Sequence, residues 1–138
     1  MGQSEFDMKQ IMILFQRRYN AICEVQRLTD ELADALSRND EVSVTMLLGM
    51  RAEEMAGFDD WTGAIWRLCD HSSRETVQKI RQLVTSEPSE NAGDSPEEKK
   101  VYEIRRKTQA VIDRVRAVDE RLNRKVTGEK SYYKAAAR

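Results

Sequence analysis

Ser86-Glu87-Pro88-Ser89-Glu90-Asn91-Ala92-Gly93-Asp94-Ser95-Pro96 contains both prolines of this 138-residue chain. A cluster of Pro, Gly, Ser and Asn is typical of a loop, because proline lacks the N–H that continues a helix. On both sides of this proline window, apolar residues recur every three or four positions, which is the period of an amphipathic helix. The sequence therefore predicts an all-α fold, divided by a loop over residues 87–95.

Two long helices are expected before the loop. The first spans residues 4–38, where an apolar row runs from Met8 to Leu36 in steps of three and four. The second spans residues 40–86 as one helix, bent if anywhere near residues 57–60, since a glycine there costs a helix about 1 kcal/mol relative to alanine. The short Asn39-Asp40 connection makes these two helices antiparallel neighbours.

One helix and a tail are expected after the loop. Ser95 can cap a helix that begins at Pro96, and a glutamate three residues after the cap completes the pattern. We expect this third helix over residues 96–127, since Gly128 is a natural helix terminator, and a flexible tail over residues 128–138.

The expected fold is a single domain of residues 1–138, an antiparallel up-down-up bundle of three long helices with coiled-coil-like packing. At 1.5 Å per residue the third helix is about 45 Å long, too short to reach the Asn39-Asp40 turn from the far end of a second helix of about 70 Å. The hairpin near that turn would then present an open apolar groove suited to a partner helix. Burial within the hairpin and coverage by a second copy are the alternatives. The groove residues would be Ile22, Val25, Leu28, Leu32, Val44, Met46, Leu47, Leu48, Met50 and Met55.

Charge is distributed unevenly along the chain, although the formal net charge is only −1. Residues 1–95 hold 10 Lys and Arg against 17 Asp and Glu, whereas residues 96–138 hold 13 against 7. Either the basic third helix packs on the acidic hairpin, or it offers a surface to an acidic partner. The basic residues surround the third helix and no base-stacking aromatics accompany them, so we expect no nucleic-acid binding.

Targeting signals are not evident in the sequence. No apolar run approaches the roughly 20 residues of a membrane-spanning helix, so we expect no membrane insertion. The first residues carry neither a basic segment nor an apolar core, and Cys23 and Cys69 are too few for a disulfide framework. We therefore expect a cytoplasmic protein.

No catalytic, cofactor-binding or metal-binding residues are expected. Asp70, His71 and Ser72 are neighbours on the predicted second helix, where adjacent side chains diverge, so they cannot form a Ser-His-Asp triad. No phosphate loop or zinc motif is present. A small helical enzyme that binds a carboxylate substrate through arginines is a remaining alternative, and its residues would be Arg17, Arg18 and Arg51.

After a long apolar-striped helix, Leu36-Ser37-Arg38-Asn39-Asp40 leads into Leu47-Leu48 and then Arg51-Ala52-Glu53-Glu54-Met55. This succession around the first turn resembles the flagellar export chaperones of the FlgN type. Ser131-Tyr132-Tyr133-Lys134 is similar to the aromatic tails of that family, whereas Ala135-Ala136-Ala137-Arg138 departs from its glycine-ending tails.

The resemblance implies a cytosolic, non-enzymatic chaperone of type III flagellar export. Its clients would be hook–filament junction proteins, also called hook-associated proteins, held by their amphipathic C-terminal helices until export. The family's last helix is implicated in client binding, which here indicates Val111, Ile112, Val115, Val118, Leu122 and Val126. The groove argument adds Leu32, Leu47 and Met50. The alternative function is a structural coiled-coil or homodimerisation domain that binds no client.

Overall fold

The computed structural model describes the backbone of residues 7–137 and the side chains of residues 7–125. Every regular element in this range is a helix: α1 (Met8–Ser37), α2 (Glu41–Arg67), α3 (Arg74–Thr85) and α4 (Pro96–Ala137). The all-α class is therefore confirmed, but the described chain forms four helices where three long helices were expected. The single-domain organisation and the coiled-coil-like packing stay predictions.

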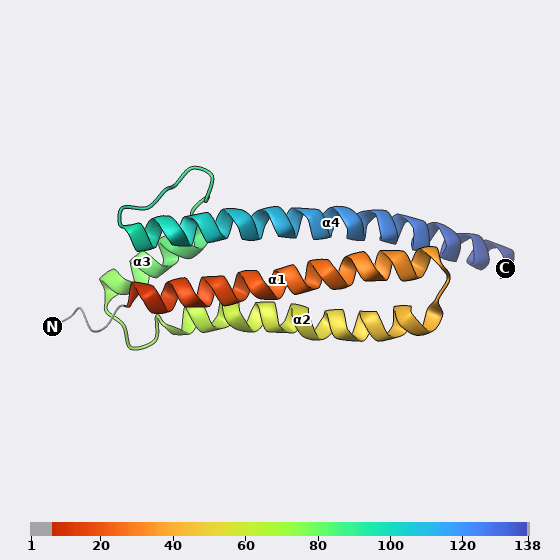
Figure 1. Cartoon of the computed structure of the whole chain (residues 1–138), viewed down its shortest axis with the longest axis horizontal. Helices are drawn as coiled ribbons and strands as arrows, with labels where there is room; N and C mark the ends of the chain where they lie inside the picture. Colours follow the sequence, from red (N-terminus) through yellow and green to blue (C-terminus); the bar gives the residue numbers. More distant parts are fainter. Residues whose placement is uncertain (1–6, 138) are drawn as a thin grey trace.

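The first turn joins α1 to α2 through only three residues, Arg38, Asn39 and Asp40. Asn39 takes a left-handed backbone conformation (φ 57°), which asparagine tolerates better than most residues. The Asp40 carboxylate then caps α2 by accepting a hydrogen bond from the Ser43 backbone N–H at 3.1 Å. Because the connection is so short, α1 and α2 run side by side in opposite directions (Figure 1).

The second helix ends much earlier than expected, so the continuous helix over residues 40–86 is wrong. The helix passes through Gly57 without a break and ends at Arg67, and six residues separate it from the start of α3 at Arg74. His71 adopts a left-handed conformation (φ 64°), and the Ser73 hydroxyl caps α3 by accepting from the Thr76 backbone N–H at 3.2 Å. A lone glycine weakens a helix without ending it, whereas a left-handed residue followed by a serine cap ends one helix and starts the next.

This early turn changes where α4 begins. α3 folds back across the end of the bundle near the N-terminus of α1, and α4 then starts beside that end and runs along α1 past the first turn (Figure 1). Leu122 of α4 packs against Leu28, Leu32 and Leu47, close to the turn. The expectation that the last helix stops short of the turn is therefore wrong. α4 covers the part of the expected groove formed by Ile22, Val25, Leu28, Leu32 and Leu47, whereas Met46, Leu48, Met50 and Met55 are exposed.

The end of α4 also differs from the expected one. Its helical backbone continues through Gly128 to Ala137, although a helix end near residue 127 and a tail over residues 128–138 were expected. The expected start of the first helix at residue 4 lies outside the described residues. Within the described part of the chain, α1 begins at Met8. The Asp7 side chain caps it by accepting a hydrogen bond from the Lys9 backbone N–H.

The proline window closes against the start of α4. Gly93 has a φ of +83°, and a Cβ atom there would lie 2.7 Å from the Glu98 Cβ, so a glycine is required. The Ser95 hydroxyl accepts from the Glu98 backbone N–H at 3.1 Å, and α4 begins at Pro96, where the sequence places a helix start. Arg106 donates to the Pro88 carbonyl at 3.0 Å, so part of the basic charge of α4 binds the loop.

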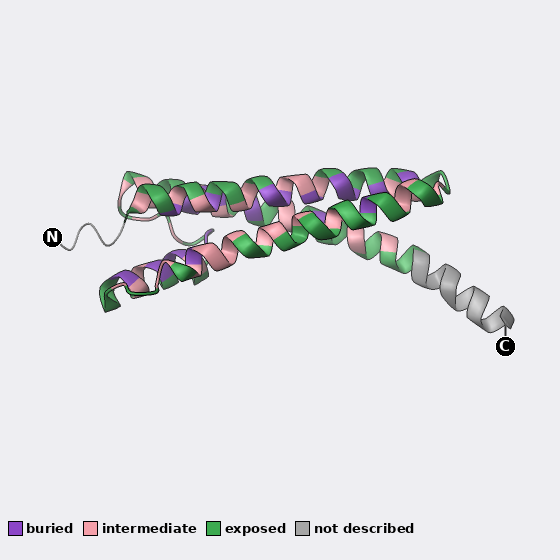
Figure 2. Cartoon of the chain, turned by 90° about the horizontal axis from the view of Figure 1, so that it is seen from below, coloured by how far each residue is buried: buried purple, intermediate pink, exposed green. Residues whose placement is uncertain are grey.

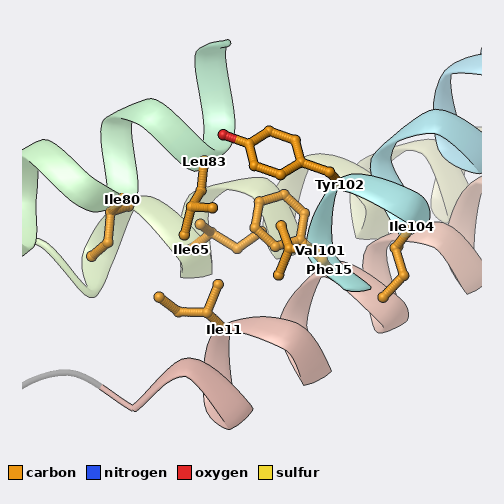
Figure 3. Close-up of a cluster of buried hydrophobic side chains, with 8 residues drawn as sticks. All are labelled: Ile11, Phe15, Ile65, Ile80, Leu83, Val101, Tyr102 and Ile104. Atoms are coloured by element: carbon orange, nitrogen blue, oxygen red, sulfur yellow. The ribbon is translucent and has the colours of Figure 1, made fainter. Parts of the chain in front are cut away.

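The principal core cluster draws on all four helices (Figure 3). α1 lies between α2 and α4 and packs against both (Figure 1). Farther along the bundle, the Arg51 guanidinium joins three helices, because it donates to the Thr29 hydroxyl of α1 at 2.9 Å and pairs with Asp119 of α4. The principal cluster consists of Ile11, Phe15, Ile65, Ile80, Leu83, Val101, Tyr102 and Ile104.

Phe15 tests how much of the stability rests on this cluster. Phe15→Ala should lower the free energy of unfolding by about 3–5 kcal/mol, because it removes a fully buried ring and leaves a cavity. Val42→Ala is the matched control, since Val42 is 81% exposed and its truncation should change that free energy by less than about 0.5 kcal/mol. Urea denaturation followed by circular dichroism measures both values, and equal effects would contradict the assigned core.

Candidate protein-binding surface

Exposed apolar side chains are concentrated on α2. Six large hydrophobic residues are exposed among the side chains of residues 7–125, and five of them lie on one stretch of this helix. Seen from the side of α2, the bundle presents exposed residues along its length (Figure 2). A surface helix is normally apolar only on the side that faces the core, so an additional apolar face marks an interaction surface. The five residues are Val42, Met46, Leu48, Met50 and Met55.

These residues form two rows with small residues between them. Successive residues of a helix are rotated by roughly 100°, so Val42, Met46 and Met50 line one edge of the exposed side of α2. Leu48 and Met55 are seven residues apart and line the other edge. We call the whole surface the α2 outer face, and it consists of Val42, Thr45, Met46, Leu48, Gly49, Met50, Ala52, Met55 and Ala56.

Gly49 lies between the two rows and is not required by the bundle. A Cβ atom at Gly49 would meet no heavy atom within 4 Å, and its backbone is ordinary α-helix. The same holds for Gly57. A glycine in a helix costs about 1 kcal/mol relative to alanine, so Gly49 weakens α2 without any compensating contact inside the described structure. Its small size instead leaves room for something outside the bundle to approach the backbone closely.

The surroundings of the α2 outer face are acidic. Glu53, Asp59 and Asp60 are exposed on α2 beside the apolar rows. Between Glu41 and Trp66 the one basic residue is Arg51, whose side chain is only 14% exposed and turns inward to Asp119. The face therefore combines apolar contact area with negative charge.

A pocket of about 390 Å³ adjoins one end of this face. Leu36, Val44 and Leu122 supply its apolar walls, and Thr45 belongs both to the pocket and to the α2 outer face. Glu41 and Lys125 lie at the same pocket and give it groups of both charges. A pocket of this size beside an exposed apolar row can receive one large apolar side chain of a bound protein.

Most of the partner-binding residues expected from the sequence are used inside the bundle. Val115 is buried with Ile22 and Val25, and Leu32 and Leu47 belong to the cluster near the first turn. These three side chains are buried between helices and present no free surface in this structure, and their role in partner binding stays a prediction. Half-buried positions of the apolar row of α4 are Val111, Ile112, Val118 and Leu122, of which Val111, Ile112 and Leu122 pack against those clusters. Met50 alone is exposed, and the Val126 side chain lies outside the described residues.

The arginines of the alternative enzyme reading do not converge on one site. The Arg17 guanidinium lies over the Trp61 ring at 5.3 Å from its centroid, whereas Arg18 donates to the Thr62 hydroxyl at 2.7 Å. Arg51 pairs with Asp119 farther along the bundle. Burial lowers the pKa of the Arg18 guanidinium, and the nearby positive charge of Arg105 lowers it further. Three separate environments give no common pocket for a carboxylate substrate.

The remaining sequence candidates for chemistry are dispersed as well. His71 is exposed in the turn between α2 and α3. Within the described residues, no three His, Cys, Asp or Glu side chains are grouped closely enough to hold a metal ion. None of the helices in that part of the chain is long and apolar enough to cross a membrane.

Ion pairs between helices do not follow the overall charge asymmetry. Across the described side chains, the pairs that join different helices are Arg51 with Asp119 and Lys79 with Glu98, and α4 supplies the acid in both. Among the described side chains, no basic residue of α4 forms an ion pair with an acidic residue of α1, α2 or α3. In the same part of the chain, Glu53, Asp59 and Asp60 form no ion pair, although Asp59 lies near the Arg18 guanidinium.

Comparison of the chain with protein-family models, with curated proteins and with solved structures finds no match.

Gly49→Ala tests whether the bundle needs the glycine. We expect the substitution to raise the free energy of unfolding by about 1 kcal/mol, because alanine favours a helix and the added methyl group meets nothing. Gly93→Ala is the opposite control and should destabilise the protein, since Gly93 has a positive φ and no room for a Cβ atom. Thermal and urea unfolding measure both changes, and destabilisation by Gly49→Ala would show that the glycine serves the fold.

Proposed function

We propose that this chain is a cytosolic export chaperone of flagellar type III secretion, which holds an amphipathic C-terminal helix of a hook–filament junction protein before export. The observation that carries the proposal is the α2 outer face, an apolar surface on an otherwise charged molecule. The similarity of the first-turn region to FlgN-type chaperones supplies the client class.

The dimensions of the face suit a helix. Residues 42–56 extend over about 20 Å, which is four helical turns. Amphipathic helices bind such surfaces through apolar side chains spaced three and four residues apart. Three of the five exposed residues are methionines, whose flexible side chains adapt to different contact surfaces. A chaperone that receives more than one client benefits from this adaptability.

The proposal places the client on α2 and not on the last helix. The resemblance implies client binding by the last helix, but the apolar row of α4 already packs against α1 in this structure. Client binding to that row would require α4 to leave the bundle and expose Ile22, Val25 and Val115. The α2 outer face needs no such rearrangement, so binding there keeps the bundle intact.

The proposed role is binding without catalysis. Arg17, Arg18 and Arg51, the arginines considered for an enzyme, contact three different groups. We propose that the chain needs no cofactor and that its activity is to mask a client's apolar surface.

A structural dimerisation domain is the second candidate, because an exposed apolar face can also pair with a copy of itself. Two copies could bury their α2 outer faces against each other. Sedimentation velocity across a range of protein concentrations distinguishes the two candidates, because a tight dimer that loses its self-association on Met50→Asp would support dimerisation and exclude a free client site.

Direct binding tests the chaperone proposal. Purified C-terminal segments of hook–filament junction proteins should bind the full chain in isothermal titration calorimetry. Met46→Asp together with Met50→Asp should weaken this binding at least about tenfold, because a carboxylate would replace each apolar contact.

Ile13→Asp is the matched control for those variants. Ile13 is 49% exposed, as much as Leu48, but it lies on α1 outside the α2 outer face. This variant should bind the client segments like the original chain. If no junction segment binds, the proposed function is wrong, whereas loss of binding with Val118→Asp but not with the α2 variants would move the site to α4.

A further inference from the structure

We propose that the α2 outer face selects a basic amphipathic helix from another protein, with the partner's apolar row lying over Gly49 and its Lys or Arg side chains paired with Glu53, Asp59 and Asp60. This inference rests on the proposed function and deepens it, because it specifies the charge of the bound helix and the place where it lies. We call that place, the line of small residues Thr45, Gly49, Ala52 and Ala56 on α2, the seat.

The spacing of the small residues suits a helix as occupant. Thr45, Gly49, Ala52 and Ala56 follow one another in steps of four, three and four, which is the spacing of a coiled-coil seam. Helices that meet at small residues can approach closely, toward the lower end of the usual range of roughly 8–10 Å between axes. This seam therefore fits the apolar row of a second helix.

The exposed apolar rows form the sides of this seat. Met46 and Met50 are 58% and 41% exposed on one edge, and Leu48 is 49% exposed on the other. Between them the α2 surface carries only small side chains. A bound helix over these small residues would contact Val42 and Met46 on one side and Leu48 on the other, and the burial of these apolar side chains is the energetic reason for binding.

The charges around the seat determine which helix it accepts. Glu53 and Asp60 continue the edge of Met46 and Met50, and Asp59 continues the edge of Leu48. Arg51 does not neutralise Glu53 or Asp60, because it is held by Thr29 and Asp119 on the inner side of α2. Asp59 lies near the Arg18 guanidinium of α1, which offsets part of its charge. A partner with Lys or Arg on both sides of its apolar row matches this pattern, and a partner with acidic flanks would be repelled.

A second copy of this chain fits the seat poorly. Pairing of two α2 outer faces would bring the carboxylates of both copies to one interface, which opposes association. α4 has exposed basic residues, Arg114, Arg116 and Arg121 among them, but none of the exposed large hydrophobic side chains of residues 7–125 lies on it. Within residues 7–125, no basic helix surface also carries exposed large apolar side chains that could cover Met46, so we assign the bound helix to a different protein.

Two synthetic peptides test the inference on the full chain. Each is a helix of about 20 residues with leucines spaced three and four apart, flanked by lysines in one peptide and by glutamates in the other. Fluorescence anisotropy with labelled peptides gives the dissociation constants. The lysine peptide should bind at least about tenfold more tightly in about 0.05 M salt, and the difference should shrink in about 0.5 M salt because the charges are exposed.

Two variants assign the binding to the seat. Gly49→Leu fills the space between the rows and should weaken binding of the lysine peptide at least about tenfold, because the hot spot lies at the centre of the contact. Urea unfolding checks that this variant remains folded, and Ala52→Leu serves in its place if it does not. The triple variant Glu53→Gln, Asp59→Asn, Asp60→Asn should reduce the preference for the lysine peptide, and Ile13→Asp should leave it unchanged.

Equal affinity for the two peptides, binding that survives both Gly49→Leu and Ala52→Leu, or no binding of either peptide would overturn the inference. The proposed function fails separately. If the lysine peptide binds at the seat but no junction segment does, the chaperone assignment is wrong and the basic-helix site stands. If junction segments bind in a way that depends on Met46 and Met50 but the lysine peptide has no advantage, the proposed function stands and the charge selection is wrong.

Discussion

The turn between α2 and α3 controls which surfaces of the molecule are covered. His71 takes a left-handed conformation there and Ser73 caps the following helix, so the chain reverses six residues after Arg67. A left-handed conformation costs a residue with a side chain roughly 1–2 kcal/mol, which the surrounding packing must offset. Because α3 then lies across the end of the bundle, α4 begins beside the start of α1 and covers it as far as the first turn. The free apolar surface is consequently on α2.

Helical periodicity predicts where helices form better than it predicts which helices pack against one another. The all-α class, the Asn39-Asp40 turn and the helix start at Pro96 all depend on local signals, namely apolar spacing, a short polar connection and a serine–proline cap. Apolar spacing does not predict the end of α2 at Arg67, because the apolar residues keep their helical spacing on both sides of the break. The relevant signal was the Ser72-Ser73 pair, which can accept the first hydrogen bonds of a new helix.

The candidate surface was only partly predictable, and for a related reason. An apolar residue on a helix can face the core or remain exposed, and sequence spacing alone does not distinguish the two when a helix is apolar on several sides. Val115 and Leu47 were therefore expected in a binding site and are buried, whereas Met50 was expected there and is exposed. The exposure of Val42 could not be inferred, because it depends on α4 packing along α1 and leaving the far side of α2 uncovered.

The separation of the α2 outer face from the core has an evolutionary consequence. None of its residues belongs to the buried clusters that hold the helices together. Substitutions of its exposed apolar side chains can therefore alter recognition with little effect on folding, whereas changes in the apolar row of α1 would disturb the contacts with both α2 and α4. Affinity and thermodynamic stability can vary independently in such a molecule, so related chains could acquire new binding preferences by drift on one helix while the scaffold is conserved.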